Sequence, residues 1–352
     1  MADQEDLGAL SVKELKARLT GLGASLDDCF EKSDLVAKLR KTLAAQPAQS
    51  GGGGAGGGGA AAAPAPPASL DSPTTTRATY GAFECTVVSN CPPGVAPELV
   101  LVLQHGYGAS ADQFDFLPAF LWGRPEHRAA PLAFVFPQAP IDAASGGMAA
   151  WWPINVMEWQ QTFFGGGDAG IAKFLRTEHP GMAAARGRAH ALVRAVAAAP
   201  ALGAVGLGRV VLGGFSQGAM VALDGGLSLP AGEGTLGGIV AVSGLPLTVD
   251  TWSGWARGHG AALHVWQSHG RSDMLLPFAA AGWLRDLLTQ AGVSLGFEAH
   301  GGGHDMGPPQ MLVKLSAFLK GRRESIMAAA AAAEGGGGGG GGGTAGGAGG
   351  AE

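Results

Sequence analysis

Residues 210–220 read VVLGGFSQGAM and contain the pattern Gly-x-Ser-x-Gly, with Ser216 at its centre. The apolar, β-branched run before the glycines predicts a buried strand, and the residues after Ser216 continue with the period of a helix. Glycine at 214 and 218 fits a cramped strand-to-helix turn, because a Cβ atom there would collide with neighbouring backbone. Such a turn exposes a serine hydroxyl above a helix N-terminus, where negative charge is stabilised. Ser216 is therefore the candidate nucleophile, although a lone pattern of this kind is equally compatible with a glycine-rich turn without chemistry.

Short apolar runs alternate with helical patterns on both sides of this stretch. The runs typical of buried strands are 83–88, 99–103, 132–136, 209–212, 239–242, 262–266 and 294–299, and the helical patterns are 182–198, 217–227, 278–290 and 309–319. Continuous apolar strands separated by helices are typical of a parallel sheet covered on both faces. The sequence therefore predicts an α/β fold with a mostly parallel, doubly wound sheet over residues 78–323. We expect the strands at 83–88 and 99–103 to form an antiparallel hairpin.

A serine nucleophile needs a general base, and the base needs a carboxylate that orients it. In the α/β-hydrolase fold these groups follow the chain order serine, acid, histidine. Asp273 comes just after the strand at 262–266, and His304 follows the last strand in a glycine-rich loop. Both positions lie at the carboxyl edge of the sheet, so Ser216, Asp273 and His304 are the predicted catalytic residues.

Other acids and histidines of the chain are candidates for the same roles. Asp250 follows the preceding strand and is the best substitute for the acid; Asp305 and Asp224 fit less well, because the first is adjacent to His304 and the second is eight residues along the helix from Ser216. Among the histidines, one falls inside a strand and two lie near the correct edge but outside the glycine-rich loop: His264, His269 and His300.

The tetrahedral intermediate of acyl transfer needs two N–H donors for its oxyanion. The segment QHGYG at 104–108 follows the strand at 99–103, where the hydrolase fold supplies one donor, and the residue after the nucleophile supplies the other. We expect the backbone N–H groups of Tyr107 and Gln217 in these roles. His105 is interpreted as making a structural hydrogen bond within the loop.

Seven blocks occur in order along residues 81–320. They read LVLQHGYGASADQF (101–114), FVFPQAP (134–140), GGMAAWWP (146–153), GFSQGAMVALD (214–224), VSGLP (242–246), SHGRSDMLLP (268–277) and GGGHDM (301–306). Together they resemble the phospholipase/carboxylesterase group of α/β-hydrolases, which includes the acyl-protein thioesterases. The resemblance implies the same three catalytic residues, with Trp151 or Trp152 lining an acyl pocket. It departs from the family at Met274, where a proline usually follows the acid, and this could alter the turn at Asp273.

The function predicted from these features is hydrolysis of carboxylic esters or thioesters through an acyl-enzyme, with no cofactor and no metal. The expected substrate is a small ester or an acylated protein. The alternative is a scaffold that binds an acylated protein without turnover, guided by the N-terminal region.

The N-terminal residues 7–43 show two helical patterns, with a capping box at Ser11 and Glu14. The pieces SVKELKARL (11–19) and EKSDLVAKL (31–39) resemble the SAP-like helical module. Relatives often carry Cys-x-x-Cys before the second piece, whereas only Cys29 is present here. Some such modules bind DNA, but residues 1–41 hold eight acidic and seven basic side chains, so this one is expected to bind a protein, or nothing, rather than phosphate.

Composition sets further bounds. Residues 44–76 consist almost entirely of glycine, alanine, proline, serine and threonine and predict a disordered linker, and residues 328–352 predict a disordered tail, within which Ala328–Ala333 could extend the last helix. The net charge of −5, without a dense basic run, gives no electrostatic reason to bind nucleic acid. Three scattered cysteines predict reduced thiols, and the acidic N-terminus without a long apolar run predicts a cytoplasmic protein without a transmembrane segment.

Overall fold

The computed structural model describes residues 18–19, 38–39 and 73–335. The chain divides into two compact units, Met1–Ala65 and Pro66–Glu352. In the first unit the described residues are helical, and Leu19 and Leu39, one from each predicted helix, are fully buried. The rest of the predicted SAP-like module at 7–43 and all but the last residues of the predicted linker at 44–76 lie outside the described residues.

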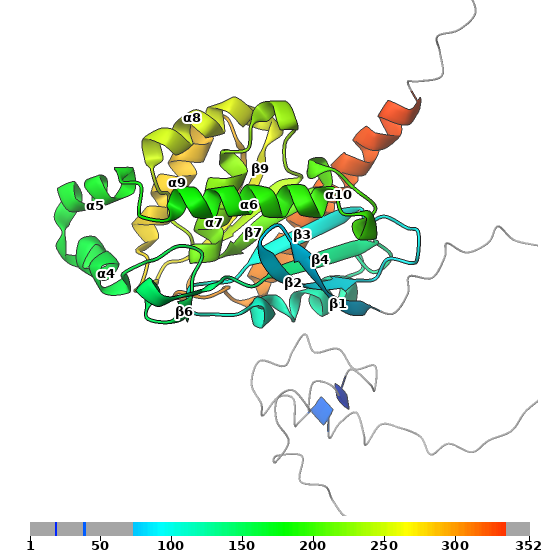
Figure 1. Ribbon diagram of the computed structural model, residues 1–352, viewed down its shortest axis with the longest axis horizontal. Helices are drawn as coiled ribbons and strands as arrows, with labels where there is room; N and C mark the ends of the chain where they lie inside the picture. Colours follow the sequence, from blue (N-terminus) through cyan, green and yellow to red (C-terminus); the bar gives the residue numbers. More distant parts are fainter. Residues whose placement is uncertain (1–17, 20–37, 40–72, 336–352) are drawn as a thin grey trace, which may run out of the picture. The chain divides into compact units, whose positions relative to one another are not determined.

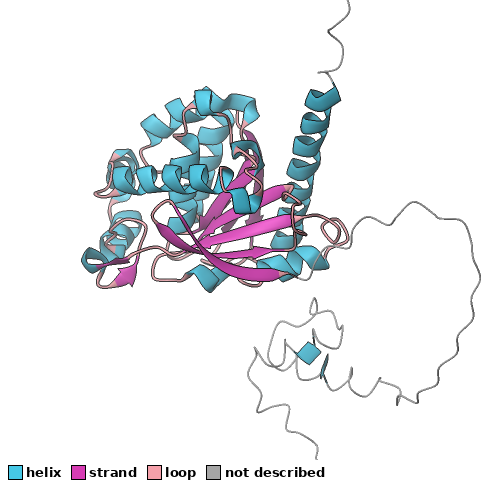
Figure 2. Ribbon diagram, turned by 45° about the vertical axis from the view of Figure 1, so that its right-hand side comes forward, coloured by secondary structure: helices cyan, strands magenta, loops and turns pink. Residues whose placement is uncertain are grey.

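The second unit is built on an eight-stranded sheet with helices on both faces (Figures 1 and 2). Its spatial order is β1-β2-β4-β3-β7-β8-β9-β10, and all neighbours from β4 to β10 are parallel. The strands are β1 (Thr74–Tyr80), β2 (Phe83–Ser89), β3 (Leu99–Gln104), β4 (Leu132–Pro137), β7 (Val210–Phe215), β8 (Gly238–Val242), β9 (His264–Gly270) and β10 (Ser294–His300). All seven predicted strands are present, and the predicted mostly parallel, doubly wound sheet is confirmed.

The predicted pairing of the first two strands was wrong. The strand at Phe83–Ser89 pairs with β1 and β4, whereas β3 lies between β4 and β7 and is parallel to both. The partner that completes the hairpin is β1, whose threonine-rich residues are mostly exposed and therefore resemble the linker that precedes them. The predicted linker consequently ended inside β1.

Helices cover the two faces of the sheet with separate apolar cores. The helices are α3 (Leu117–Gly123), α4 (Val156–Gly165), α5 (Gly167–Arg176), α6 (Met182–Ala197), α7 (Gln217–Leu227), α8 (Val249–His259), α9 (Phe278–Gln290) and α10 (Pro309–Gly335). The larger core joins one face of the sheet to α6, α7, α8 and α9. The smaller core joins the other face to α3 and the first turns of α10. Among the described residues, none of the helices is both long and apolar enough to span a membrane.

The last helix is longer than predicted. α10 continues through the alanine run to Gly335. The predicted disorder of residues 328–335 was therefore wrong, and the alternative, in which Ala328–Ala333 extends the last helix, is confirmed. Alanine has the highest helix propensity, and the first part of α10 is already fixed by Leu315 and Leu319 in the core. Residues 336–352 lie outside the described part of the chain.

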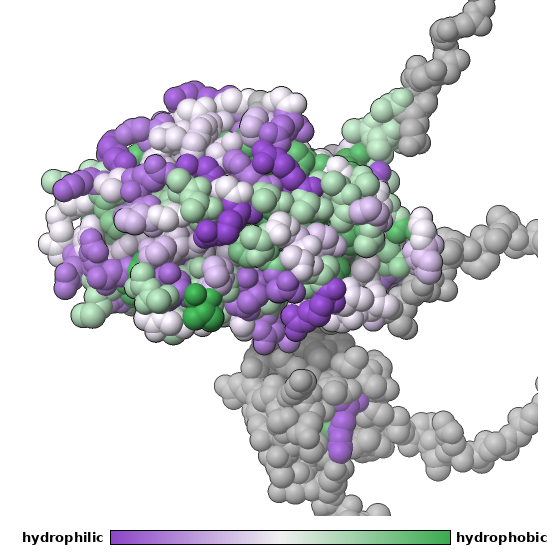
Figure 3. All heavy atoms as spheres, viewed as in Figure 1, coloured by the Kyte–Doolittle hydropathy of each residue, from purple (hydrophilic) through white to green (hydrophobic). Residues whose placement is uncertain are grey.

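A small hairpin and a helical pair project from the sheet on the side of the nucleophile. The hairpin is formed by β5 (Ile141–Asp142) and β6 (Met148–Ala149), and Ile141 at its start is 71% exposed. Figure 3 shows a strongly hydrophobic spot where Figure 1 labels β6, within a surface of mixed hydropathy. The helical pair is α4 with α5, which follows the hairpin in the chain.

The two described cysteines are free. Cys85 is buried in β2 and Cys91 is half-buried beyond it. Burial raises the pKa of Cys85 to about 12, so its thiol stays protonated at neutral pH. Cys29 lies outside the described residues.

Candidate active site

Ser216 occupies the tight turn between β7 and α7. Its backbone has φ 53° and ψ −120°, a conformation that is strained for any residue with a Cβ atom. Its N–H donates to the carbonyl of Val242 at the end of β8, 2.8 Å away. The flanking glycines are required, because a Cβ atom would lie 2.4 Å from the Gln104 carbonyl oxygen at position 214 and 1.9 Å from it at position 218. The turn anticipated from the sequence is therefore present.

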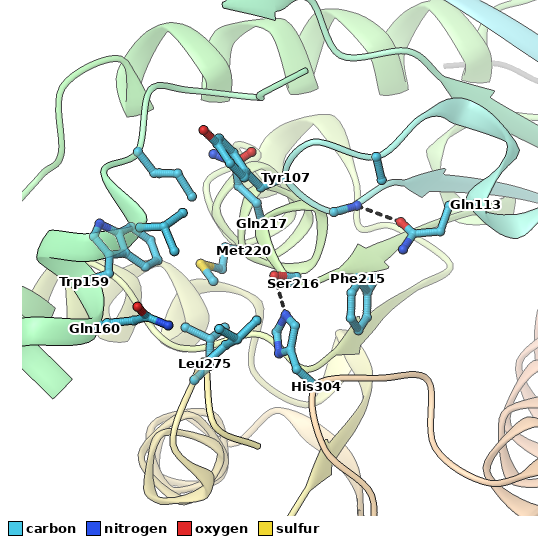
Figure 4. A pocket seen from close by; sticks show the side chains of 15 residues that line it. Tyr107, Gln113, Trp159, Gln160, Phe215, Ser216, Gln217, Met220, Leu275 and His304 are labelled. Carbon is cyan, nitrogen blue, oxygen red and sulfur yellow. Dashed lines mark hydrogen bonds between the residues drawn. The ribbon is translucent and has the colours of Figure 1, made fainter. Parts of the chain in front are cut away.

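The structure brings Ser216, His304 and Asp273 together at the carboxyl edge of the sheet. His304 Nε2 lies 2.9 Å from Ser216 Oγ, and His304 Nδ1 lies 2.7 Å from Asp273 Oδ2 (Figure 4 draws the first contact). Because the carboxylate can only accept, Nδ1 carries the proton of the neutral ring and Nε2 is free to accept the serine proton. The three residues follow β7, β9 and β10, which reach the same edge because these strands are parallel.

The Asp273 side chain is fully buried and all its lone-pair directions are occupied. Oδ1 accepts the N–H groups of Leu275 and Leu276 at 2.9 and 2.8 Å, and Oδ2 faces His304 and, at 3.3 Å, Nε2 of His269. Burial alone would raise the pKa of Asp273, but hydrogen bonds from His269, His304 and Leu276 outweigh it and hold the pKa well below its ordinary value. The group is therefore ionised at neutral pH.

The residue after the acid does not disturb this turn. Met274 is 72% exposed, and the carboxylate itself closes the turn by accepting two backbone N–H groups. A proline is consequently not needed to hold the carboxylate toward His304.

The substitute acids have other partners. Asp250 lies in the first turn of α8, is exposed, and pairs with Arg176 at 3.2 Å. Asp224 is buried but accepts from Arg186 Nε at 2.8 Å and Trp252 Nε1 at 2.7 Å. The carboxylate of Asp305 accepts the N–H groups of Gly303 and Gly307 within the histidine loop.

The alternative histidines are likewise away from the serine. His300 Nδ1 accepts the Gly302 N–H at 3.2 Å, and His269 lies behind Asp273, where its Nε2 also donates to the carbonyl of Leu276 at 3.0 Å. His264 is in β9, at its first residue. In this arrangement only His304 bridges the serine and an acid.

The loop after β3 faces Ser216 with one free N–H group. The N–H of Gly106 donates to Gln113 Oε1 at 2.7 Å, and that of Gly108 donates to the Ala149 carbonyl at 2.8 Å. Within the described part of the chain, the N–H groups of Tyr107 and Gln217 donate to no protein acceptor. Both residues line the same cavity as Ser216 (Figure 4).

A cavity of about 210 Å³ opens beside Ser216 and His304. Its walls are mainly apolar and come from the loop after β3, from α4 and the residue before its cap, from β7 and α7, and from the loops that carry Asp273 and His304. The apolar side chains in them include Ile154, Val156, Trp159, Phe215, Met220, Leu275 and Leu276. Figure 4 shows Met220 and Trp159 on the side of the serine away from Phe215. The apolar lining suits an acyl chain attached to a carbonyl at Ser216.

Trp151 and Trp152, predicted to line an acyl pocket, do not line this cavity. Both are at most 2% exposed, and Trp151 Nε1 donates to the carbonyl of His105 at 2.7 Å. The Gln217 side chain accepts from the Trp151 N–H and donates to the Trp152 carbonyl, so the two tryptophans brace the segment beneath the nucleophile.

The indole in the wall is that of Trp159, which lies on α4, a helix absent from the sequence-based prediction. A signal was available, because Asn155 caps α4 by accepting the N–H of Glu158 at 3.2 Å, and Asn-x-x-Glu is typical of a helix start.

The fold and this arrangement of side chains define an α/β-hydrolase. Residues 85–322 match the Phospholipase/Carboxylesterase family, and since this is more than half of the chain, the chain belongs to that family. It is 32% identical over 160 residues to acyl-protein thioesterase 1 of Schizosaccharomyces pombe, a match that covers 44% of this chain and 60% of that protein. It is 27% identical over 181 residues to acyl-protein thioesterase 1 of Saccharomyces cerevisiae, covering 50% of this chain and 71% of that protein.

Among solved structures, a carboxylesterase from Mesorhizobium loti has the same fold. It matches with a TM-score of 0.50 and 18% identity, over 70% of this chain and 99% of that one.

Proposed function

We propose that this protein is a serine hydrolase that cleaves carboxylic esters or thioesters through an acyl-enzyme. The observation that carries the proposal is the hydrogen-bonded series from Ser216 to His304 to Asp273, at 2.9 and 2.7 Å, beside an apolar cavity. Membership of the Phospholipase/Carboxylesterase family and the names of the two yeast relatives support acyl chemistry.

Acylation begins when Ser216 Oγ attacks the carbonyl carbon and its proton passes to His304 Nε2. Asp273 holds the Nδ1–H of the ring and stabilises the imidazolium that forms. The oxyanion accepts hydrogen bonds from the backbone N–H groups of Tyr107 and Gln217, which donate to no other acceptor among the described residues. His304 then protonates the departing alcohol or thiol, whose loss leaves the acyl group on Ser216.

Deacylation repeats the sequence with water as the nucleophile. His304 Nε2 takes the proton of the attacking water. As the tetrahedral intermediate collapses, the imidazolium returns this proton to Ser216 Oγ, which releases the carboxylic acid and restores the serine hydroxyl. The apolar walls hold the acyl chain, and each methylene that they cover contributes about 0.8 kcal/mol to binding. We expect the substrate to be a small ester or an acylated protein.

A fluorophosphonate probe tests the proposal directly. It should label the full chain stoichiometrically, and Ser216→Ala should abolish both labelling and hydrolysis of p-nitrophenyl esters and of a palmitoyl thioester, with a loss of kcat on the order of 10⁶. Absence of labelling in the folded wild-type chain would instead support the second candidate, a scaffold that binds acylated proteins without turnover. Retention of more than about 1% of kcat in the variant would remove Ser216 from the nucleophile's role.

A further inference from the structure

His105 is a fully buried histidine directly before the loop that carries Tyr107. Its Nδ1 lies 2.8 Å from the carbonyl oxygen of Gly106, and because a carbonyl can only accept, Nδ1 carries the proton. Its Nε2 then accepts the N–H of Ala139 at 3.1 Å and faces the amide nitrogen of Gln138 at 3.2 Å. Burial lowers the pKa of His105 more than the Gly106 carbonyl and Asp112 raise it, which agrees with a neutral ring in this one tautomer.

The carbonyl held by His105 belongs to the same peptide group as the Tyr107 N–H. A trans peptide is planar, and its C=O and N–H bonds point in opposite directions. Fixing the direction of the Gly106 carbonyl therefore fixes the direction of the Tyr107 N–H. Besides the ring, that carbonyl accepts only the N–H of Ala109, at 3.1 Å, among the described residues.

The ring also connects this peptide to a rigid part of the sheet. Gln138 and Ala139 directly follow β4, and the amide oxygen of Gln138 accepts the N–H of Ala111 at 3.0 Å, beyond the same loop. The carbonyl of His105 itself accepts from Trp151 Nε1. The histidine is thus held on both sides while its Nδ1–H points at one peptide of the loop.

We propose that His105 is a positioning residue for the oxyanion hole, whose Nδ1–H holds the Gly106 carbonyl and thereby aims the Tyr107 N–H at the carbonyl oxygen of the substrate. This inference rests on the proposed function, since it assigns a role in the same reaction. His105 touches no reacting atom and acts through the Gly106–Tyr107 peptide.

Two variants separate the two ring nitrogens. His105→Asn places an amide nitrogen near the position of Nδ1 and retains the donor to Gly106. His105→Gln places its amide near the position of Nε2, retains a partner for Ala139 and Gln138, and loses the donor to Gly106. We expect His105→Gln to lower kcat about tenfold with KM within about twofold, and His105→Asn to stay within about threefold of wild type, because a misdirected donor costs less than the roughly 10²-fold of a deleted one.

A pair of inhibitors distinguishes positioning from general damage. An alkylboronic acid, which forms a tetrahedral adduct with the serine, should bind His105→Gln more weakly in proportion to the loss of kcat/KM, while an ether analogue of the substrate should bind as it does to wild type. Wild-type kcat in His105→Gln, an equal loss in His105→Asn, or equal weakening of both inhibitors would overturn the inference.

Measurements on the wild-type chain keep the test independent of how the variants fold. Nitrogen-15 NMR of the full wild-type chain, with the His105 ring resonances assigned by through-bond correlation to the backbone of that residue, should show a neutral ring protonated at Nδ1, and protonation at Nε2 would overturn the inference. Wild-type labelling by the fluorophosphonate probe is checked first. Absence of labelling would contradict the proposed function. Labelling of the wild-type chain without the expected differences between the two His105 variants and the two inhibitors would contradict the role of His105 alone.

Discussion

Ser216 has a strained backbone conformation, which the tight turn imposes, and carries the hydroxyl that the proposed reaction needs. A positive φ with ψ near −120° is a region that glycine adopts freely and that costs other residues on the order of 1–3 kcal/mol. Serine at this position brings its hydroxyl to the edge of the sheet at the expense of stability. Replacement of Ser216 by glycine should therefore abolish activity and increase stability.

Ser216→Gly and Ser216→Ala should both be inactive but differ in stability. Glycine relieves the strain and alanine retains it, so the glycine variant should have the higher free energy of unfolding, by about 1 kcal/mol. Urea denaturation of the two variants, side by side, measures the difference. Equal stabilities would mean that the surrounding structure relaxes around the turn and that little strain is stored there.

The acid is the residue for which the sequence left an alternative. Asp273→Asn should lower kcat by about 10⁴, because an amide in place of the carboxylate favours the wrong tautomer of His304 and leaves the imidazolium unsupported. Asp250→Asn is the matched control and should change kcat by less than about twofold, since its carboxylate lies on α8 and pairs there with the exposed Arg176. Both are measured on one activated ester. A severe loss at Asp250 with a mild one at Asp273 would reverse the assignment of the acid.

At the scale of elements, the sequence predicts the parts of the fold whose pattern is local. Continuous apolar strands such as Leu99–Gln104, and the helix after Ser216, were found where they were predicted, because burial on both faces requires an unbroken apolar run. Strand β1 was missed because its side chains face solvent and its stability comes from pairing with β2, which no local pattern records.

The candidate site also has parts that a local sequence pattern predicts and parts that it does not. Ser216, Asp273 and His304 could be predicted since each follows a recognisable strand and the carboxyl ends of parallel strands converge. The walls of the cavity could not, because α4 meets the serine through packing between segments far apart in the chain. Trp159 thus lines the cavity where Trp151 or Trp152 was predicted. The sequence shows His269 only as an alternative to His304, because its contact with Asp273 depends on the fold of the turn between the two residues.

The attachment of α10 gives a prediction with a defined pH dependence. Glu126 Oε1 accepts from Ser316 Oγ at 2.7 Å, joining the segment after α3 to the start of α10. Burial alone would raise the pKa of Glu126, but hydrogen bonds from Ser316, the backbone and Arg124 lower it from 4.5 to about 2. A depressed pKa in the folded state stabilises the protein above pH 4.5, and this contribution is lost as the pH falls toward 2.

Glu126→Gln should accordingly lower the free energy of unfolding by about 1–2 kcal/mol at pH 7 and by progressively less from pH 4.5 downward. Urea denaturation at pH 7, 5, 4 and 3 measures the difference in the free energy of unfolding between variant and wild type, which should become smaller as the pH falls. Glu324→Gln, at an exposed position later on the same helix, is the control and should have little effect at any of these pH values. A difference independent of pH would show that the glutamine is destabilising through packing rather than through charge.

At the scale of the whole molecule, every residue of the proposed reaction lies in the second unit. The candidate catalytic residues, the loop at 104–108 and the cavity walls all fall between Gln104 and His304. The family match begins at residue 85 and ends at 322, so the unit that holds the candidate catalytic residues is also the unit shared with the family. The N-terminal region is consequently not expected to take part in turnover.

A chain lacking residues 1–72 should retain kcat on a small ester within about twofold, because this cut removes no group of the site and leaves β1 intact. A chain lacking residues 1–81 is the matched comparison. It also loses β1, whose seven residues pair with β2 and whose Tyr80 is buried in the larger core, so it should unfold at a lower temperature and leave β2 as an unprotected edge prone to aggregation. Ester hydrolysis and thermal unfolding of both chains are measured together. If deletion of residues 1–72 already abolished activity, these residues would have to contribute to the site or to its folding. The assignment of turnover to the second unit by itself would then be wrong.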